Sequence, residues 1–190
     1  MTNTGRAKFK KYKVAINLLA KLFSFFGRKL NFLFLSFFRD TGGIVGILLR
    51  YIFLKNCCES LGDNVSIKTG VYLLNCKKLK IGNNVSIHPM CYIDAAGGIC
   101  IENEVSIAHN CSILSANHQW HDLNTPIKYN KEALAPVIIK NDVWVGCGVR
   151  ILAGVVVESR SVIAAGAVVN KNIEGNSVYG GVPAKKIKNI

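Results

Sequence analysis

The chain has 190 residues, half of them hydrophobic, with 24 basic residues against 11 acidic residues. The hydrophobic share excludes an intrinsically disordered chain, and the length suits one domain with an attached segment. Most of the excess positive charge lies in residues 1–60, which hold 11 Lys and Arg but only two acidic residues. The seven cysteines show no metal-ligand spacing, so we expect small buried hydrophobic residues in a reducing, cytoplasmic compartment.

Residues 1–56 form a basic, aromatic-rich segment for which we predict helices. Residues 1–13 are a basic arm, and apolar stretches follow at 14–38 and 44–54. Lysine and arginine interrupt both stretches before about 18 uncharged residues accumulate, so we do not expect a membrane-spanning helix. No small-residue cleavage site follows, which argues against a removed signal peptide. Because the basic residues alternate with Phe and Leu and no nucleic-acid-binding motif is present, we do not expect nucleic acid as a partner.

Two roles fit this N-terminal segment equally well. Large apolar side chains recur at helical steps of three and four: Phe23, Phe26, Leu30, Leu33 and Phe37. A helix of this kind, with lysine and arginine nearby, can lie on an anionic membrane surface and make the protein peripheral on the cytoplasmic face of the membrane. Alternatively, the helices cap the first coil of the following domain, because an open coil end exposes apolar side chains and strand edges.

Residues 57–190 contain short repeats that predict an all-β fold. Three stretches begin alike at a spacing of 20 residues, and an isoleucine follows each: 61–66 (LGDNVS), 81–86 (IGNNVS) and 101–106 (IENEVS). Aliphatic residues also recur every six positions, in two runs: Ile81, Ile87, Ile93 and Ile99, then Ile139, Val145, Ile151, Val157, Ile163 and Val169. Three such steps per repeat are typical of a triangular parallel β-helix, whose stacked coils share one core.

The aliphatic ladder is interrupted once, by the loop 114–137. This loop is polar and aromatic, has no six-residue rhythm and carries two of the four histidines of the chain. An insertion of this length in a regular solenoid is more often functional than accidental. We therefore expect active-site residues in it.

Four motifs follow in order: 136–146 (PVIIKNDVWVG), 151–155 (ILAGV), 162–169 (VIAAGAVV) and 181–185 (GVPAK). With them, the chain from Leu61 to the C-terminus resembles the hexapeptide-repeat acyltransferases, and it is most similar to the maltose, galactoside and polysaccharide O-acetyltransferases. The resemblance implies a left-handed parallel β-helix assembled as a homotrimer. It also implies that acetyl-CoA lies in the groove between neighbouring subunits, so that the active site is shared.

The resemblance implies that His118 is the catalytic residue. Imidazole can take the proton of a sugar hydroxyl near neutral pH as the hydroxyl attacks a thioester, and can then protonate the departing thiolate. Substrate-binding positions are implied at Asn117, His121, Asp122 and Trp144. Three of these residues have a second interpretation. His121 could be exposed to solvent without binding the acceptor, and Asp122 could orient an imidazole instead of binding a sugar hydroxyl. Trp144 could pack between subunits of the trimer.

Cofactor-binding positions are implied at six residues: Cys147, Ala165, Asn170, Lys171, Lys185 and Lys188. The backbone N–H of Cys147 matches a position that meets the thioester oxygen, so its thiol need not react. Ala165 and Asn170 match positions where main-chain groups hold the amide-rich pantetheine arm. The lysines match positions that approach the phosphates of CoA, where charge-assisted contacts are needed; the lysines at the C-terminus are alternatively a solvated tail.

We therefore predict a trimeric enzyme that transfers acetyl from acetyl-CoA directly to a hydroxyl of a sugar, polysaccharide or glycolipid precursor, with no metal. A nucleotide-sugar N-acyltransferase is the nearest alternative. A zinc enzyme like the γ-class carbonic anhydrases is another, since three imidazoles and a water make a catalytic zinc set, with four candidate ligands: His88, His109, His118 and His121. The last alternative is an inactive trimeric scaffold.

Overall fold

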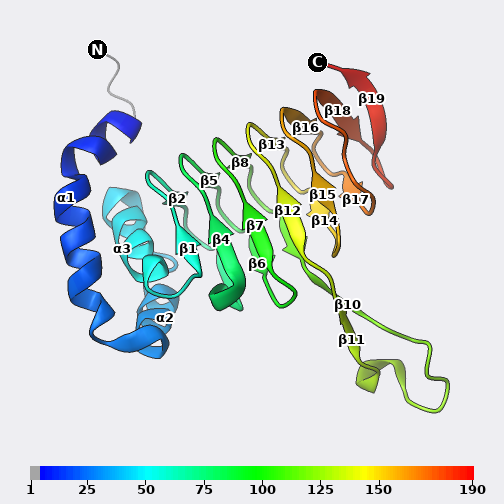
Figure 1. Ribbon diagram of the computed structural model, residues 1–190, viewed down its shortest axis with the longest axis horizontal. Helices are drawn as coiled ribbons and strands as arrows, with labels where there is room; N and C mark the ends of the chain where they lie inside the picture. Colours follow the sequence, from blue (N-terminus) through cyan, green and yellow to red (C-terminus); the bar gives the residue numbers. More distant parts are fainter. Residues whose placement is uncertain (1–4) are drawn as a thin grey trace.

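The computed structural model describes residues 5–190, in which three helices precede a β-helix (Figure 1). The first four residues of the predicted basic arm lie outside this range. The helices are α1 (Gly5–Ser24), α2 (Gly27–Phe37) and α3 (Gly43–Lys55). Gly27 and Gly43 have positive φ values of 68° and 67°, which a Cβ disfavours, so the chain turns there. The helical spacing that begins at Phe23 is therefore divided between α1 and α2. No helix in the described range is long and apolar enough to cross a membrane.

From Ser60 the chain winds into the predicted left-handed parallel β-helix, a triangular prism with one sheet on each side. Sheet A contains β1 (Ser60–Leu61), β4 (Leu79–Ile81), β7 (Ile99–Ile101), β12 (Val137–Ile139) and β15 (Val156–Val157). Sheet B contains β2 (Ser66–Ile67), β5 (Ser86–Ile87), β8 (Ser106–Ile107), β13 (Trp144–Val145), β16 (Ser161–Ile163), β18 (Ser177–Gly180) and β19 (Lys185–Asn189). Sheet C contains β3 (Tyr72–Leu74), β6 (Tyr92–Asp94), β9 (Ser112–Leu114), β14 (Arg150–Ile151) and β17 (Val168–Val169). The 3₁₀ helix η1 (Cys76–Lys78) lies between β3 and β4.

The predicted aliphatic ladder forms the core of the prism. All ten residues of the two six-residue runs are at most 2 % exposed. Parallel pairing stacks equivalent positions of successive coils, as Ile81 on Ile101. Each such side chain contributes about 1.5–3 kcal/mol when fully buried. Five cysteines are buried as predicted, whereas Cys100 and Cys147 are half-buried, and all seven are free thiols.

The corner that begins each repeat explains the shared Asn and Asp residues. Equivalent corner residues have left-handed φ values of 54–59°: Asn64, Asn84 and Glu104. Asparagine tolerates this conformation better than most residues. The residue before each corner also links the coils, because the N–H of Asp63 donates to Asn83 Oδ1 (2.8 Å). The repeat therefore encodes both the turn and the stacking of successive coils.

Helix α3 covers the open end of the first coil. In the second coil, the Ile87 carbonyl accepts a hydrogen bond from the Lys68 N–H of the coil before it (2.9 Å). The equivalent carbonyl of Ile67 has no earlier coil to bond. Arg50 of α3, which is 1 % exposed, donates from Nε to this carbonyl (2.9 Å). Thus α3 satisfies a group that an uncapped strand edge would leave open.

Candidate active site

The predicted loop leaves the prism after β9 and folds into an antiparallel hairpin (Figure 1). Its elements are β10 (Ala116–His118), the 3₁₀ helix η2 (Ile127–Tyr129) and β11 (Glu132–Leu134). His118 lies opposite Glu132 in this hairpin. At the base, the buried Ser115 donates from Oγ to the Asp94 carbonyl (2.7 Å). This bond ties the hairpin to the preceding coil of the prism.

A cavity of about 530 Å³, the hairpin cavity, lies beside these strands. It is lined by Asn117, His118, Gln119, Trp120, His121, Ala133 and Leu152. The structure thus brings together three predicted site residues, namely Asn117, His118 and His121. The ring of Trp120 lies 5.5 Å from that of His121. The volume lies within the range of small-molecule sites.

Sequence reasoning missed four residues that line the hairpin cavity. Gln119 and Trp120 lie between predicted residues, and a large aromatic residue in a polar loop is a usable indication of a binding site. Ala133 lies opposite Asn117 across the hairpin, and Leu152 belongs to the next coil. Neither carries an indication in the sequence, because their place depends on how the hairpin folds back.

Asp122 does not line the hairpin cavity. Its carboxylate accepts hydrogen bonds from the Thr125 hydroxyl (2.7 Å) and from the Asn124 N–H (3.0 Å). These two bonds lower the pKa of Asp122, the Thr125 bond most strongly. In one chain, the carboxylate is therefore occupied in holding the turn of the hairpin.

A β-bulge places Lys185 and Lys188 on one outward face of sheet B. Val178 of β18 lies opposite Lys188 of β19, and the register shifts between Val178 and the next pair. Because of this shift, the two lysines share a face although they are three residues apart. Trp144 lies in the same row of pairs, through Val162 and Val178. With strands about 4.8 Å apart, Trp144 and Lys188 lie about 14 Å from one another.

Cys147 and Ala165 occupy the same corner in successive coils, between sheets B and C. The Gly166 N–H donates to the Cys147 carbonyl (2.8 Å), which stacks the two corners. The Cys147 N–H donates to no acceptor in the part of the chain that the structure describes. This N–H therefore keeps hydrogen-bonding capacity for a ligand at the corner.

Asn170 and Lys171 lie exposed at a different corner, after β17. Leu152, which lines the hairpin cavity, donates its N–H to the Val169 carbonyl of the next coil (3.0 Å). Asn170 is therefore one coil beyond the cavity. The predicted residues of one chain thus form two groups. The hairpin group contains Asn117, His118, His121, Asn170 and Lys171, and the sheet B group contains Trp144, Cys147, Ala165, Lys185 and Lys188.

The four histidines do not gather in one chain. His88 and His109 lie at corners of the prism, whereas His118 and His121 lie on and beside the hairpin strands. Burial is the main cause that lowers the pKa of His88, with nearby positive charge on Lys68 and His109 adding to it. Within residues 5–190, no three His, Cys, Asp or Glu side chains are grouped so that they could hold a metal ion.

Comparison with known proteins is informative for this geometry. Residues 136–171 match the family model described as bacterial transferase hexapeptide (six repeats). The chain resembles a maltose O-acetyltransferase structure from Clostridium difficile 630 with a TM-score of 0.76 and 27 % identity, over 91 % of this chain and 88 % of that one. A galactoside acetyltransferase structure in complex with coenzyme A has a TM-score of 0.73 and 26 % identity, over 85 % and 80 %. Residues 136–171 of this chain therefore contain repeats of the bacterial hexapeptide-transferase type.

Curated relatives match this chain over shorter segments. Galactoside O-acetyltransferase of Escherichia coli K12 is 39 % identical over 71 residues, which are 37 % of this chain and 35 % of the relative. The matched segments span about a quarter to a third of the length of the curated relatives. The family model covers Trp144, Cys147 and Ala165 but ends before Lys185 and Lys188. It also begins after His118.

Proposed function

We propose that this chain is a hexapeptide-repeat transferase, namely an acetyl-CoA-dependent O-acetyltransferase that acts on a hydroxyl of a sugar, polysaccharide or glycolipid precursor. The observation that carries the proposal is the exposed imidazole of His118 in a cavity of ligand size beside the coils. Relatives and solved neighbours that are named galactoside or maltose O-acetyltransferases support the choice of reaction and acceptor. The free, mostly buried cysteines support a cytoplasmic location.

His118 acts as the general base in this proposal. Its imidazole accepts the proton of the acceptor hydroxyl while that oxygen forms a bond to the thioester carbonyl carbon. When the carbon–sulfur bond breaks, the imidazolium returns the proton to the departing thiolate, so His118 ends the cycle neutral. Acetyl-CoA supplies the acetyl group already activated as a thioester. The Cys147 N–H donates a hydrogen bond to the carbonyl oxygen as negative charge develops there.

The residues of the sheet B group fit the chemistry of CoA. Lys185 and Lys188 are exposed and share a face, and neither forms an ion pair within residues 5–190. Lys186, between them, is instead paired with Glu174 (2.7 Å). Two free ammonium groups on one face suit a ligand with several phosphates. We assign Asn170 and Lys171 to the same ligand from the other corner.

The two groups of residues also support a shared active site in a homotrimer. The hairpin group and the sheet B group lie at different corners and faces of the prism in one chain. When prisms pack side by side around a three-fold axis, the hairpin of one subunit can face sheet B of its neighbour. His118 from one chain then completes the groove of the next.

The reaction is tested with acetyl-CoA and a panel of free sugars, nucleotide sugars and lipid-linked glycans. We expect release of free CoA thiol only when a hydroxyl acceptor is present, and a product whose acetyl group is removed by mild alkali. An alkali-stable product would identify an amide and favour the N-acyltransferase alternative. Failure to bind acetyl-CoA in calorimetry would contradict the proposal altogether.

Replacing Lys185 and Lys188 together with Ala is expected to weaken CoA binding. Loss of charge-assisted contacts to phosphate costs roughly 1–3 kcal/mol, which is about 5- to 150-fold in Kd. Isothermal titration calorimetry measures the change. Lys186→Ala is the matched control, because it removes a lysine of the same strand that is already paired with Glu174. Equal affinity of the double variant and the unmodified protein would refute the phosphate role.

Mixing two inactive variants is expected to restore activity if the site is shared. One variant carries His118→Ala, and the other carries Lys185→Glu and Lys188→Glu, so each damages a different group. After random subunit exchange, about a quarter of the interfaces in a trimer combine an intact base with an intact groove. Activity of the mixture relative to the unmodified protein gives this fraction. No recovery after exchange verified by native mass spectrometry would mean that each chain builds its own site.

A further inference from the structure

A second cavity lies between the helices and the first coil. Its volume is about 450 Å³, and it is bounded by α1, the first half of α3 and the region of β2. Figure 1 shows these elements at the N-terminal end of the prism, whereas the hairpin leaves the prism after the third strand of sheet C. The helix cavity is therefore separate from both groups of candidate active-site residues.

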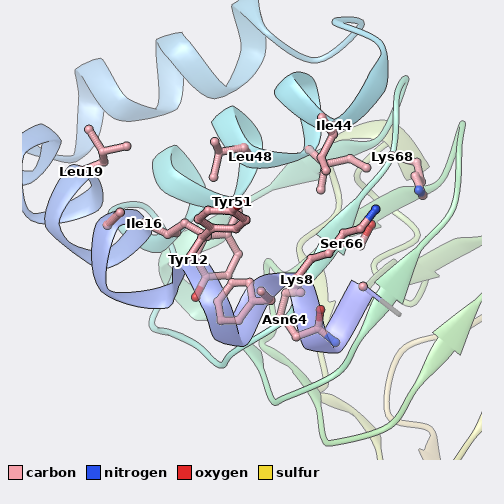
Figure 2. A pocket seen from close by; sticks show the side chains of 15 residues that line it. Lys8, Tyr12, Ile16, Leu19, Ile44, Leu48, Tyr51, Asn64, Ser66 and Lys68 are labelled. Carbon is pink, nitrogen blue, oxygen red and sulfur yellow. The ribbon is translucent and has the colours of Figure 1, made fainter. Parts of the chain in front are cut away.

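Both lysines that line the helix cavity lie toward one of its ends. Figure 2 shows Ile16 and Leu19 toward one end, and Lys8, Ser66 and Lys68 toward the other. An apolar pocket with a few converging polar groups at one end orients a ligand that has the same division. The shape of the lining thus calls for an amphiphile, with a hydrocarbon part and an anionic part.

The two lysines of the helix cavity have charge that the protein does not neutralise. Arg6 and Lys13, on the same helix as Lys8, form ion pairs with acidic side chains of the coils (2.7 and 2.5 Å). These two pairs hold α1 along the corner of the prism. Neither Lys8 nor Lys68 forms an ion pair within residues 5–190. A phosphate at this end of the cavity would meet two free ammonium groups.

Part of the lining of the helix cavity is exposed apolar and aromatic surface. Ile44 and Tyr12 line the cavity and yet are 69 % and 54 % exposed. Val45, next to Ile44 in the chain, is 59 % exposed. Apolar surface of this kind around a basic pocket is typical of a membrane contact. A hydrocarbon chain can enter the cavity from a bilayer without crossing water.

We propose that the helix cavity binds one hydrocarbon chain of an anionic membrane phospholipid, with the lipid phosphate at Lys8 and Lys68. The cavity volume is in the range of ligand pockets. The hydrocarbon tail suits the apolar end of the cavity, and the negative phosphate suits the two lysines at the other end. The site holds the protein at a membrane surface, since lysines near an anionic leaflet are attracted to it. It does not depend on acetyl transfer, because none of its residues belongs to the hairpin or sheet B group.

The test uses the full chain and lauroyl lysophosphatidylglycerol below its critical micelle concentration, with binding followed by isothermal titration calorimetry. We expect saturable binding with one lipid per chain. Glycerol 3-phosphate, which has the head group but no tail, is expected to show no measurable binding at the same concentrations. Binding of glycerol 3-phosphate as tight as that of the lipid would overturn the proposal in favour of a phosphate site.

Two pairs of matched variants locate the lipid. Leu19→Gln makes the apolar end of the cavity polar and is expected to weaken lipid binding about tenfold or more. Leu18→Gln changes the neighbouring exposed residue, which does not line the cavity, and is expected to leave lipid binding within about twofold. Lys8→Gln with Lys68→Gln is expected to weaken binding by a similar factor, whereas Lys10→Gln with Lys11→Gln removes the same charge outside the cavity and has little effect.

Three outcomes would overturn the proposal. Equal losses in Leu18→Gln and Leu19→Gln would mean that lipid adsorbs to the exposed helix face. Equal losses in the two lysine pairs would mean that only the total charge matters. Absence of saturable lipid binding would by itself overturn the proposal, and self-association that Leu19→Gln abolishes in analytical ultracentrifugation would then assign the cavity to a second copy of the chain.

Discussion

Replacing His118 with Ala is expected to lower kcat by about 10²- to 10⁴-fold, while acetyl-CoA affinity stays nearly unchanged. This fall in kcat is the usual effect of losing a positioned proton acceptor. Alanine cannot accept the proton of the acceptor hydroxyl in place of the imidazole. CoA affinity is preserved because Lys185 and Lys188, which are assigned to the phosphates, lie on sheet B, and because His118 is assigned no contact with CoA. Steady-state kinetics and calorimetry on the same preparation measure both quantities.

Two other histidines supply the controls for His118→Ala. His121→Ala alters the same cavity and is expected to act mainly on the KM of the acceptor, with a smaller effect on kcat. His88→Ala changes a corner of the prism outside the cavity and two coils before that of Cys147, and it is expected to leave kcat within a few-fold. Unchanged turnover in His118→Ala would rule out the general-base assignment, since both proton transfers in the proposal require this imidazole.

The fold follows from the sequence because its rules are local and repeated. Each six-residue step places one aliphatic residue inward, and the corners carry residues that accept positive φ, so the sequence predicts both the sheets and the coils. Ile163 and Val169 lie in the core as this rule requires. The break between Ile113 and Ile139 is visible for the same reason, as the one place where the rule fails.

The details of the site are less predictable because they depend on contacts between distant segments. Leu152 reaches the hairpin cavity only because the hairpin folds back over the next coil. Lys185 and Lys188 share a face only because of a β-bulge, which their spacing of three residues does not predict. The turn role of Asp122 depends on Thr125 and Asn124, which become partners only in the folded hairpin.

The sequence suggests a helical cap over the first coil as one of two roles, but not the part of Arg50 in it, because an arginine in an apolar stretch is usually interpreted as exposed. Arg50 is instead buried and donates hydrogen bonds to carbonyls of two segments. Its Nη1 reaches the carbonyls of Phe38, Arg39 and Thr41 between α2 and α3 (2.8–3.0 Å). Its Nε reaches the first coil at Ile67 (2.9 Å). One side chain therefore joins the helical segment to the open end of the β-helix.

Replacing Arg50 with Met is expected to lower the free energy of unfolding by about 2–5 kcal/mol. The carbonyls of Thr41 and Ile67 have no other donor within the described residues, and each buried carbonyl left unpaired costs about 1–3 kcal/mol. Burial also opposes the charged form of Arg50, lowering its pKa, and Nη2 has no partner among the described groups. Methionine removes the cost of burying the charge. The expected loss in the free energy of unfolding is therefore smaller than the cost of the unpaired carbonyls together with the loss of a buried side chain.

Thermal unfolding at one fixed protein concentration measures this effect, because oligomers melt at concentration-dependent temperatures. For a chain of this length we expect Tm to fall by roughly 4–20 °C, at about 2–4 °C per kcal/mol.

Arg28→Met, at an exposed position of α2, is the matched control and is expected to change stability by no more than about 0.5 kcal/mol. Arg50→Lys keeps the charge, but one ammonium group cannot span both Ile67 and the α2–α3 connection, so its Tm should lie between the two. An Arg50→Met variant with the same Tm as the unmodified chain would contradict this role of Arg50. It would show that the free-energy cost of burying the charge equals the stabilisation from the hydrogen bonds, so that Arg50 does not hold the cap in place.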